Sequence, residues 1–224
     1  MIKNISNLGD AALYCDFGME VNRETNTKVI EYFKSIKKEN IDGVNNLTPS
    51  YNKLIISFDL KKINYQQMKK LIENININTH DNLNNKKIEI PVCSDQTFSL
   101  DIKRLEKKLK LSSEKIYENF FNKEFFCYMT GFIAGMPFLG DLDKKIRAKR
   151  LETPRVKVPK GSVGLTEQFA NIYTFESPGG WNIIGNTPLN IFDSSNEKNP
   201  NLINPGDSVI FKRITKDKYE NYNV

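Results

Sequence analysis

The stretch Gly-Phe-Ile-Ala-Gly-Met-Pro-Phe-Leu-Gly-Asp-Leu at residues 131–142 places glycine and proline inside an apolar run, and it decides the fold of the C-terminal part. The stretches Thr-Pro-Arg-Val-Lys-Val-Pro-Lys-Gly-Ser-Val-Gly at 153–164 and Glu-Ser-Pro-Gly-Gly-Trp-Asn-Ile-Ile-Gly-Asn-Thr-Pro at 176–188 repeat this pattern. Nine of the 12 glycines and seven of the nine prolines lie after residue 130. Short apolar runs separated by such turns are typical of an all-β barrel or sandwich.

The part before residue 130 alternates strand-like and helix-like segments. Residues 11–17 and 53–59 are apolar runs that predict strands. Residues 24–38 and 64–74 carry apolar side chains at helical spacing, which predicts two amphipathic helices. Together these segments indicate a small α+β layer of the split βαβ type.

The asparagine-rich residues 74–85 predict a linker or an exposed loop, and residues 87–93 begin a new strand. We therefore expect two domains, an α+β domain over residues 1–85 and a barrel domain over residues 86–224. A chain of 224 residues with 39% hydrophobic residues can bury a core without disulfides or a metal.

Residues 99–120 are expected to be helical in two pieces. Leu100, Leu105 and Leu109 form one apolar stripe, which predicts the first helix. Ser112 begins a Ser-Ser-Glu sequence typical of a helix N-cap, so the second helix is expected to start there.

The formal charge of +6 is spread along the chain and is not gathered in one tail or domain. It amounts to +2 over residues 1–90, +4 over residues 91–150 and zero over residues 151–224. The basic residues are 27 Lys and only 6 Arg, and arginine is the residue that binds phosphate and guanine with two parallel hydrogen bonds. With 27 Asn and 24 Ile, the lysines fit an A/T-rich genome, and we expect no nucleic-acid partner.

The cysteine and histidine content excludes several kinds of site. Cys15, Cys93 and Cys127 are odd in number and far apart, which predicts neither a disulfide framework nor a zinc site and favours the cytoplasm. The single histidine, His80, lies in a polar stretch and is expected to be a solvated loop residue, so we expect no multi-histidine metal site and no Ser/His/Asp triad. The sequence has no export signal and no apolar run long enough to span a membrane, so no membrane partner is expected.

The three Gly/Pro-rich stretches can form rigid loops with exposed backbone amides, which suit an anionic or amide-containing ligand. Barrel corners also need glycine and proline, so a purely structural role stays open. Arg155 is suited either to clamp a carboxylate or phosphate or to form a surface ion pair. Glu176 is suited either to general-base chemistry or to an exposed strand-end position.

Two further side chains in these stretches are candidates. Ser162 is a hydrogen-bond donor between Gly161 and Val163, and it is a poor nucleophile because no base is adjacent in the sequence. Trp181 fits core packing or a pocket wall. The candidate catalytic residues are Arg155, Glu176 and Ser162, and the candidate substrate-binding residues are Gly135, Pro137, Ser177, Pro178, Gly179, Gly180 and Trp181.

A basic cluster precedes the second of these stretches. It consists of Lys144, Lys145, Arg147, Lys149 and Arg150, and it is either a solvated face or a place for phosphate steering. The chain has neither a G-x-x-x-x-G-K-[ST] loop nor a strand-linked G-x-G-x-x-G. If ATP is used, we expect another chain to hold much of it.

The order and spacing of these motifs resemble the family of 5-oxoprolinase B-type subunits, also called KipI-like or allophanate hydrolase subunit 1-like. The resemblance covers nearly the whole chain, and its most specific signal is the pair Pro-Lys-Gly-Ser-Val-Gly at 159–164 and Ser-Pro-Gly-Gly-Trp at 177–181. Further matching motifs are Gly9-Asp10-Ala11, Pro49-Ser50-Tyr51, Ile90-Pro91-Val92-Cys93, the run from Gly131 to Leu142, Thr153-Pro154-Arg155, Ile172-Tyr173, Ile184-Gly185, Thr187-Pro188, Phe192-Asp193 and Pro205-Gly206-Asp207.

The resemblance implies a fold and a function. The fold is α+β, a small N-terminal α+β sandwich domain followed by a cyclophilin-like β-barrel domain. The function is that of one component of a three-protein 5-oxoprolinase, which opens the lactam of 5-oxo-L-proline to L-glutamate at the expense of ATP. The C-type subunit of that enzyme, with a related barrel, is the expected direct partner, and the A-type subunit is the third component.

The sequence departs from the family pattern at several polar positions. A histidine that the family usually carries is Phe120, and the family's Ile-Gly-Arg-Thr-Pro has Asn186 in place of arginine. The usual Ala-Gly-Gly-Gln-Thr-Gly is replaced by residues 166–171, which include Phe169, and Pro-Gly-Phe-Pro is replaced by residues 134–137.

These departures keep two further hypotheses open. One is a regulatory binding protein, because the family also includes an inhibitor of a sporulation histidine kinase and such a role needs only a surface. The other is a degenerate carboxyltransferase-like component of urea or allophanate metabolism.

Overall fold

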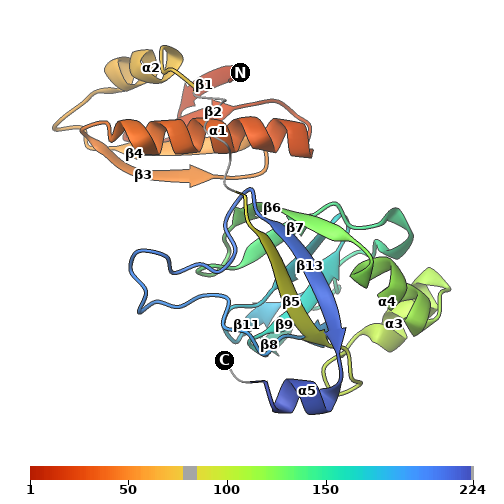
Figure 1. The fold of residues 1–224 in the computed structure, drawn as a ribbon. Coiled ribbons are helices and arrows are strands. Elements are labelled where there is room, and N and C mark those ends of the chain that lie inside the picture. Colours follow the sequence, from red (N-terminus) through yellow and green to blue (C-terminus); the bar gives the residue numbers. More distant parts are fainter. Residues whose placement is uncertain (78–84, 223–224) are drawn as a thin grey trace. The chain divides into compact units, whose positions relative to one another are not determined.

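The computed structural model describes residues 1–77 and 85–222 of the chain. The chain divides into two compact units, Met1–Asn84 and Asn85–Val224, which are described separately (Figure 1). His80 and most of the expected linker's second half lie outside the described residues.

The N-terminal unit combines one four-stranded sheet with two helices. Its elements are β1 (Asn4–Asn7), β2 (Ala12–Asp16), α1 (Arg23–Glu39), β3 (Val44–Pro49), β4 (Lys53–Phe58) and α2 (Tyr65–Glu73). The strand order is β1-β2-β4-β3, and every pairing is antiparallel.

This topology contains the expected split βαβ motif. The strands β2 and β3 are both antiparallel to β4, which lies between them, so β2 and β3 run parallel and α1 connects them. The strands predicted at 11–17 and 53–59 are β2 and β4. The sequence does not predict β1 and β3, because both are sheet edges that contain only one or two large apolar residues each among polar ones.

Helix α1 and helix α2 begin where asparagine caps them. The Asn22 side chain accepts a hydrogen bond from the Thr25 amide, and Asn64 forms a reciprocal capping box with Gln67. The apolar faces of the helices then pack against the sheet. The core of this unit consists of Ile5, Leu13, Cys15, Phe17, Val29, Ile36, Leu54, Ile56, Phe58, Met68 and Ile72.

The C-terminal unit is built around a closed barrel of seven strands, which confirms the α+β fold with a β-barrel. Its strands are β5 (Lys87–Cys93), β6 (Glu124–Thr130), β7 (Pro137–Gly140), β8 (Arg155–Val158), β9 (Ser162–Thr166), β10 (Phe169–Ile172), β11 (Ser177–Gly179), β12 (Asn182–Asn186) and β13 (Ser208–Ile214). Its helices are α3 (Ile102–Leu109), α4 (Ser113–Phe121), the 3₁₀ helix η1 (Lys144–Ile146) and α5 (Lys216–Glu220).

Around the barrel the strand order is β10-β7-β6-β13-β5-β12-β9, and β8 and β11 form a separate two-stranded ribbon. The first and last strands of the unit, β5 and β13, lie side by side and run parallel, which closes the barrel between segments far apart in the sequence (Figure 1).

The two helices predicted within residues 99–120 are α3 and α4, and the Ser112 side chain caps α4 by accepting from the Lys115 amide. One detail of the prediction is wrong. Leu100 precedes α3 and is 46% exposed, because the helix begins at Ile102 and that residue supplies the buried position at its start.

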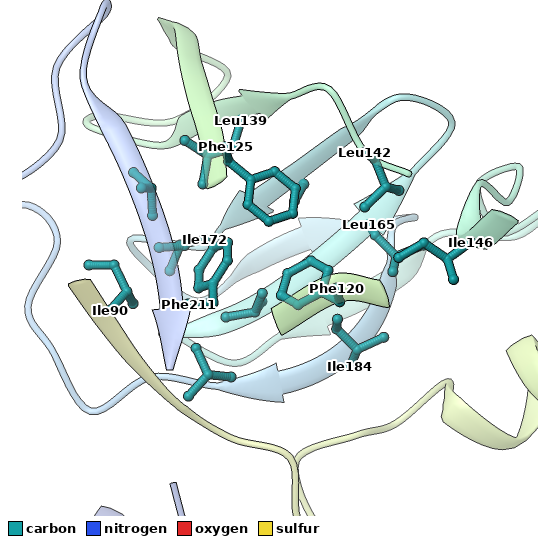
Figure 2. Packing of buried hydrophobic residues seen from close by; sticks show 14 of the residues in the cluster. Ile90, Phe120, Phe125, Leu139, Leu142, Ile146, Leu165, Ile172, Ile184 and Phe211 are labelled. Carbon is teal, nitrogen blue, oxygen red and sulfur yellow. The ribbon is translucent and has the colours of Figure 1, made fainter. Parts of the chain in front are cut away.

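Helix α4 contributes an aromatic side chain to the barrel interior (Figure 2). The ring of Phe120 stacks on Phe211 of β13 with 4.9 Å between centroids, and it lies 5.1 Å from the ring of Phe125. Aliphatic side chains such as Leu165, Ile172 and Ile184 fill the rest of the same core (Figure 2). The barrel is therefore a packed core and its outer surface is where a site can form.

Candidate functional site

The three Gly/Pro-rich stretches meet on the outer face of the barrel. Side chains of a strand alternate between its two faces, and Ala170, Ile172 and Ile184 point into the barrel core. Tyr173 and Ile183 are the sequence neighbours of Ile172 and Ile184, so their side chains point to the opposite face. Both belong to a second hydrophobic cluster, outside the barrel core.

This outer cluster consists of Met136, Val158, Tyr173 and Ile183, with Ile133 packed against it. Met136 comes from the first stretch, Val158 from the second and Ile183 from the third. Phe138 and Trp181 add an edge-to-face contact between the first and third stretches, with ring centroids 5.6 Å apart. Because Val158 belongs to β8, the β8–β11 ribbon covers part of this outer face.

Glycine is required where the loops and the ribbon approach their neighbours. Gly135 has φ +69°, and a Cβ there would overlap the ring of Phe192. A Cβ on Gly179 would overlap the hydroxyl of Tyr173, so the ribbon can lie on the outer cluster only with glycine at this position. Pro137, the other candidate in the first stretch, is buried at the start of β7.

Arg155 is bound to a carboxylate of the same unit. Its Nη1 and Nη2 donate to Oδ2 and Oδ1 of Asp101 at 3.0 and 2.7 Å, and Asp101 Oδ2 also accepts from the Ile183 amide at 2.7 Å. The Asp101 side chain is 4% exposed and the Arg155 side chain 28%. The pair therefore joins β8 to β12 and to the start of α3, and both terminal nitrogens of Arg155 are already used.

Glu176 and Ser162 lie in different surroundings. Glu176 Oε1 is 3.0 Å from Lys157 Nζ, and both side chains are exposed at the edge of the ribbon. Ser162 is buried on β9, where its Cα pairs with that of Asn186 on β12. The structure therefore brings Arg155 and Glu176 to the same two-stranded ribbon and keeps Ser162 inside the sheet.

The remaining candidates occupy the ribbon and the turn after it. Pro178 is exposed, and the Gly180 carbonyl accepts a hydrogen bond from the Leu151 amide at 2.7 Å. The hydroxyl of Ser177 is buried and has no hydrogen-bond partner among the described residues. It is a polar group that a ligand or a water molecule can satisfy.

Sequence reasoning missed two polar side chains beneath the ribbon, Asn171 and Tyr173. Asn171 is fully buried, its Nδ2 lies 3.9 Å from Met136 Sδ, and its Oδ1 has no hydrogen-bond partner among the described residues. Burial raises the pKa of Tyr173, while hydrogen bonds with the Asn171 side chain and the Trp181 backbone oppose the rise. The signal in the sequence was an asparagine and a tyrosine alternating with the apolar residues of β10.

The basic cluster at 144–150 lies against this site. Ile146 and Ala148 anchor it in the barrel core, and Arg147 Nε donates to the Leu142 carbonyl at 2.9 Å. Arg150 is exposed, and its guanidinium lies beside Gly180, since a Cβ on that glycine would be 3.2 Å from Nε and Nη2. Arg150 is thus the cation next to the candidate loop.

The residues that depart from the family pattern have structural contacts of their own. Phe120 lies in the barrel core, and Phe169 meets Tyr128 edge to face at 5.6 Å. Asn186 Oδ1 accepts from the Tyr219 hydroxyl at 2.8 Å, and its Nδ2 donates to the Lys160 carbonyl at 2.9 Å. Asn186 therefore holds α5 against the barrel.

Three structural observations bear on the chemistry this chain offers. Within residues 1–77 and 85–222, no group of three or more His, Cys, Asp or Glu side chains is arranged to hold a metal ion. Cys15, Cys93 and Cys127 are buried and unpaired. None of the helices in the described part of the chain has the length and apolar character needed to cross a membrane.

Comparisons with known proteins identify the family. The model of the carboxyltransferase domain, subdomain C and D, matches residues 3–203. The chain is 33% identical to the 5-oxoprolinase B subunit of Bacillus subtilis over 97% of its own length and 95% of that protein. It superimposes on the crystal structure of TTHA0988 with a TM-score of 0.82 and 27% identity, over 91% of this chain and 40% of TTHA0988.

A likeness in fold alone extends to the urea amidolyase of K. lactis, with a TM-score of 0.79 and 19% identity over 96% of this chain and 15% of that protein. The near full-length match to the Bacillus subtilis protein and the domain model agree with the observed two-unit α+β architecture. The chain belongs to the 5-oxoprolinase B-type subunit family of carboxyltransferase-domain proteins.

Proposed function

We propose that this chain is a non-autonomous subunit of an ATP-dependent 5-oxoprolinase that hydrolyses the lactam of 5-oxo-L-proline to L-glutamate together with the A-type and C-type subunits. The observation that carries the proposal is the match to a 5-oxoprolinase B subunit over 97% of this chain. The convergence of the three Gly/Pro-rich stretches on one face supports it, because a site shared with a partner needs an accessible rim.

The reaction explains why such a rim is useful. A lactam carbonyl is a poor electrophile, so phosphorylation of its oxygen by ATP followed by attack of water lowers the barrier if fixed donors stabilise the developing charge. In this proposal ATP is a co-substrate of the complex and is held mainly by another chain. Arg150 and the backbone amides around Gly179 and Gly180 are the groups of this chain that face the charged reactants.

In this proposal the substrate binds next to the two buried polar atoms that lack hydrogen-bond partners among the described residues, Ser177 Oγ and Asn171 Oδ1. Ser177 Oγ can donate to a carboxylate or carbonyl oxygen, and Asn171 Oδ1 can accept from an amide N–H. A 5-oxoproline carries both kinds of group. Glu176 is the exposed carboxylate on the same ribbon and takes the role of general base in this scheme.

Partner binding is supported by exposed apolar side chains on or beside the same three stretches. Phe132 is 70% exposed, Val156 is 81% exposed and Phe175, two residues before β11, is 43% exposed. Exposed large apolar groups that gather near a site mark protein contacts. We assign this surface to a C-type subunit, with an A-type subunit completing a cytoplasmic complex.

The site is tested by variants in a complex reconstituted from the three purified subunits. Glu176→Gln is expected to lower turnover of 5-oxoproline by about 10²-fold, the usual contribution of a general base. Lys157→Gln is the matched control, because it breaks the same ion pair but keeps the carboxylate, and it should retain turnover. Equal turnover in both variants would remove Glu176 from the mechanism.

A second candidate function is inhibition of a sensor histidine kinase, a role that needs only a surface. It is favoured by the structural roles of Phe120, Phe169 and Asn186, which occupy positions where the family usually carries polar groups. Its test is kinase autophosphorylation with and without this chain. The third alternative, a component of urea or allophanate metabolism, is supported by the match to the carboxyltransferase-domain model and by the likeness in fold to the K. lactis protein.

A further inference from the structure

A groove of about 330 Å³ lies between the C-terminal half of α1 and the strand β3 in the N-terminal unit. Its lining includes Phe33, Ile36, Lys37, Ile41, Val44 and Leu47. The strand β3 is at the edge of the four-stranded sheet, beside α1 (Figure 1). Edge strands carry backbone groups that can pair with another chain.

The register shows which backbone groups of β3 point outward. Ser50 donates its amide to the Lys53 carbonyl at 2.9 Å, so in this antiparallel ladder Thr48 and Ile55 also form a hydrogen-bonded pair. Leu47, opposite Ile56, is then at a non-hydrogen-bonded position. Its amide and its carbonyl both point away from β4, toward the groove edge.

The side chain of Leu47 faces the helices. Leu47 lies opposite Ile56, which is buried in the core of this unit, and paired residues of an antiparallel ladder share a face. A residue of an added strand that pairs with Leu47 would therefore place its own side chain on the same face, next to Phe33 and Ile41.

The groove also carries a positive charge. Lys37 is the one charged side chain that the described residues contribute to its lining, and its Nζ lies 5.9 Å from the centroid of the Phe33 ring. Among those residues no acidic side chain lines the groove. Its positive charge therefore complements an acidic group of a partner, and the same groove of a second copy of this chain offers no such group. The register shift between Val44 and Asn46, together with Pro49, limits regular pairing to a few residues.

We propose that this groove binds a short extended segment of a partner protein, which adds to β3 by pairing with Leu47. The segment places one apolar side chain between α1 and β3 and one acidic side chain beside Lys37. This is the strand-addition mode of peptide recognition, in which main-chain hydrogen bonds give affinity and alternate side chains give specificity.

The test uses a random dodecapeptide phage library selected on the full chain, followed by NMR titration with the enriched peptides. We expect peptides in which an apolar residue and an Asp or Glu stand two positions apart, since both side chains must lie on the face next to α1, and we expect the Leu47 amide signal to shift on binding. Leu47→Pro removes the outward amide without removing a hydrogen bond to β4, and it should abolish binding. Lys37→Glu should raise the dissociation constant of the acidic peptides about tenfold.

Lys107→Glu, an exposed charge reversal on α3, is the matched control and should leave binding unchanged. The proposal is overturned if no enriched peptide binds below about 1 mM, or if Leu47→Pro and Lys37→Glu both bind like the wild type. It is also overturned if ultracentrifugation shows a dimer that Leu47→Pro dissociates, since the edge would then pair with a second copy.

Discussion

Arg155 of β8 donates two parallel hydrogen bonds, at 3.0 and 2.7 Å, to the buried carboxylate of Asp101, which lies 54 residues earlier in the chain. This pair fixes the β8–β11 ribbon over the outer face of the barrel. It makes Arg155 a positioning residue for the candidate site.

Arg155→Ala is expected to destabilise the barrel because it leaves the Asp101 carboxylate buried without its cation. Breaking a buried pair costs roughly 3–5 kcal/mol, and the 28% exposure of Arg155 reduces the expected loss to about 2–3 kcal/mol. The measurement is urea unfolding at neutral pH. Lys157→Ala, on the same strand but in an exposed ion pair, is the control and should change stability by less than about 1 kcal/mol.

If Arg155→Ala and Lys157→Ala unfold at the same urea concentration, the Arg155–Asp101 pair does not hold the ribbon. In that case Arg155 returns to the set of residues that could bind the substrate.

Gly179→Ala is expected to destabilise the protein by about 1–3 kcal/mol, because the added methyl group would overlap the Tyr173 hydroxyl and push the ribbon off the outer cluster. Gly180→Ala is the matched control. Its added methyl group would be 3.2 Å from the flexible end of Arg150, which can move aside. Thermal unfolding compares the two variants, and equal melting temperatures would contradict the described packing of the ribbon.

Tyr219→Phe is expected to loosen α5. The substitution keeps the ring contact with Phe98 at 4.5 Å but leaves Asn186 Oδ1 without its donor, at a cost of about 0.5–1.5 kcal/mol. Faster amide hydrogen exchange over Lys216–Glu220 is the readout. Tyr222→Phe, at a 39% exposed position, should leave exchange unchanged, and the same rate in both variants would exclude the Asn186 contact as the anchor.

The N-terminal unit should lose stability in acid through Asp16. The hydrogen bond from Lys53 Nζ, at 2.5 Å, lowers the pKa of Asp16 from its ordinary 3.8; partial burial opposes this, and the Gly18 amide adds to the lowering. A lowered folded pKa means that the stabilisation is complete above pH 3.8 and disappears as the pH falls through the folded value.

Asp16→Asn should therefore unfold more easily at neutral pH and should show a flatter loss of stability below pH 3.8 than the wild type. The measurement is the urea midpoint of the N-terminal unit's transition between about pH 2 and 6. Parallel acid profiles of wild type and variant would show that the Asp16–Lys53 pair contributes nothing to folding.

The elements that the sequence predicts well are those with a local physical signal. Residues 53–59 are an apolar run and form β4, and the cap at Ser112 marks the start of α4 in the structure. The strands β1 and β3 carry no such signal, because an edge strand is stabilised by its neighbour and not by its own apolar content. Leu100 shows the limit of helical spacing, since the pattern extends beyond the residue where the helix begins.

In the candidate site, too, the sequence predicts the parts that have a local signal and misses the parts that depend on tertiary packing. Glycine and proline density located the three stretches that form the outer cluster. The partner of Arg155 could not be predicted, because Asp101 is brought to it only by the packing of α3 against the barrel. Asn171 on β10 and Tyr173 just after it could be assigned to the site only once the structure showed that both contact the outer cluster.

The proposed function can be measured in one reaction, in which this chain is mixed with purified A-type and C-type subunits and the L-glutamate formed from 5-oxo-L-proline is followed. We expect ATP-dependent product only when all three proteins are present. The proposed function would be contradicted if the A-type and C-type subunits alone give the same rate, or if the three assemble and remain inactive while this chain inhibits autophosphorylation of a sensor histidine kinase.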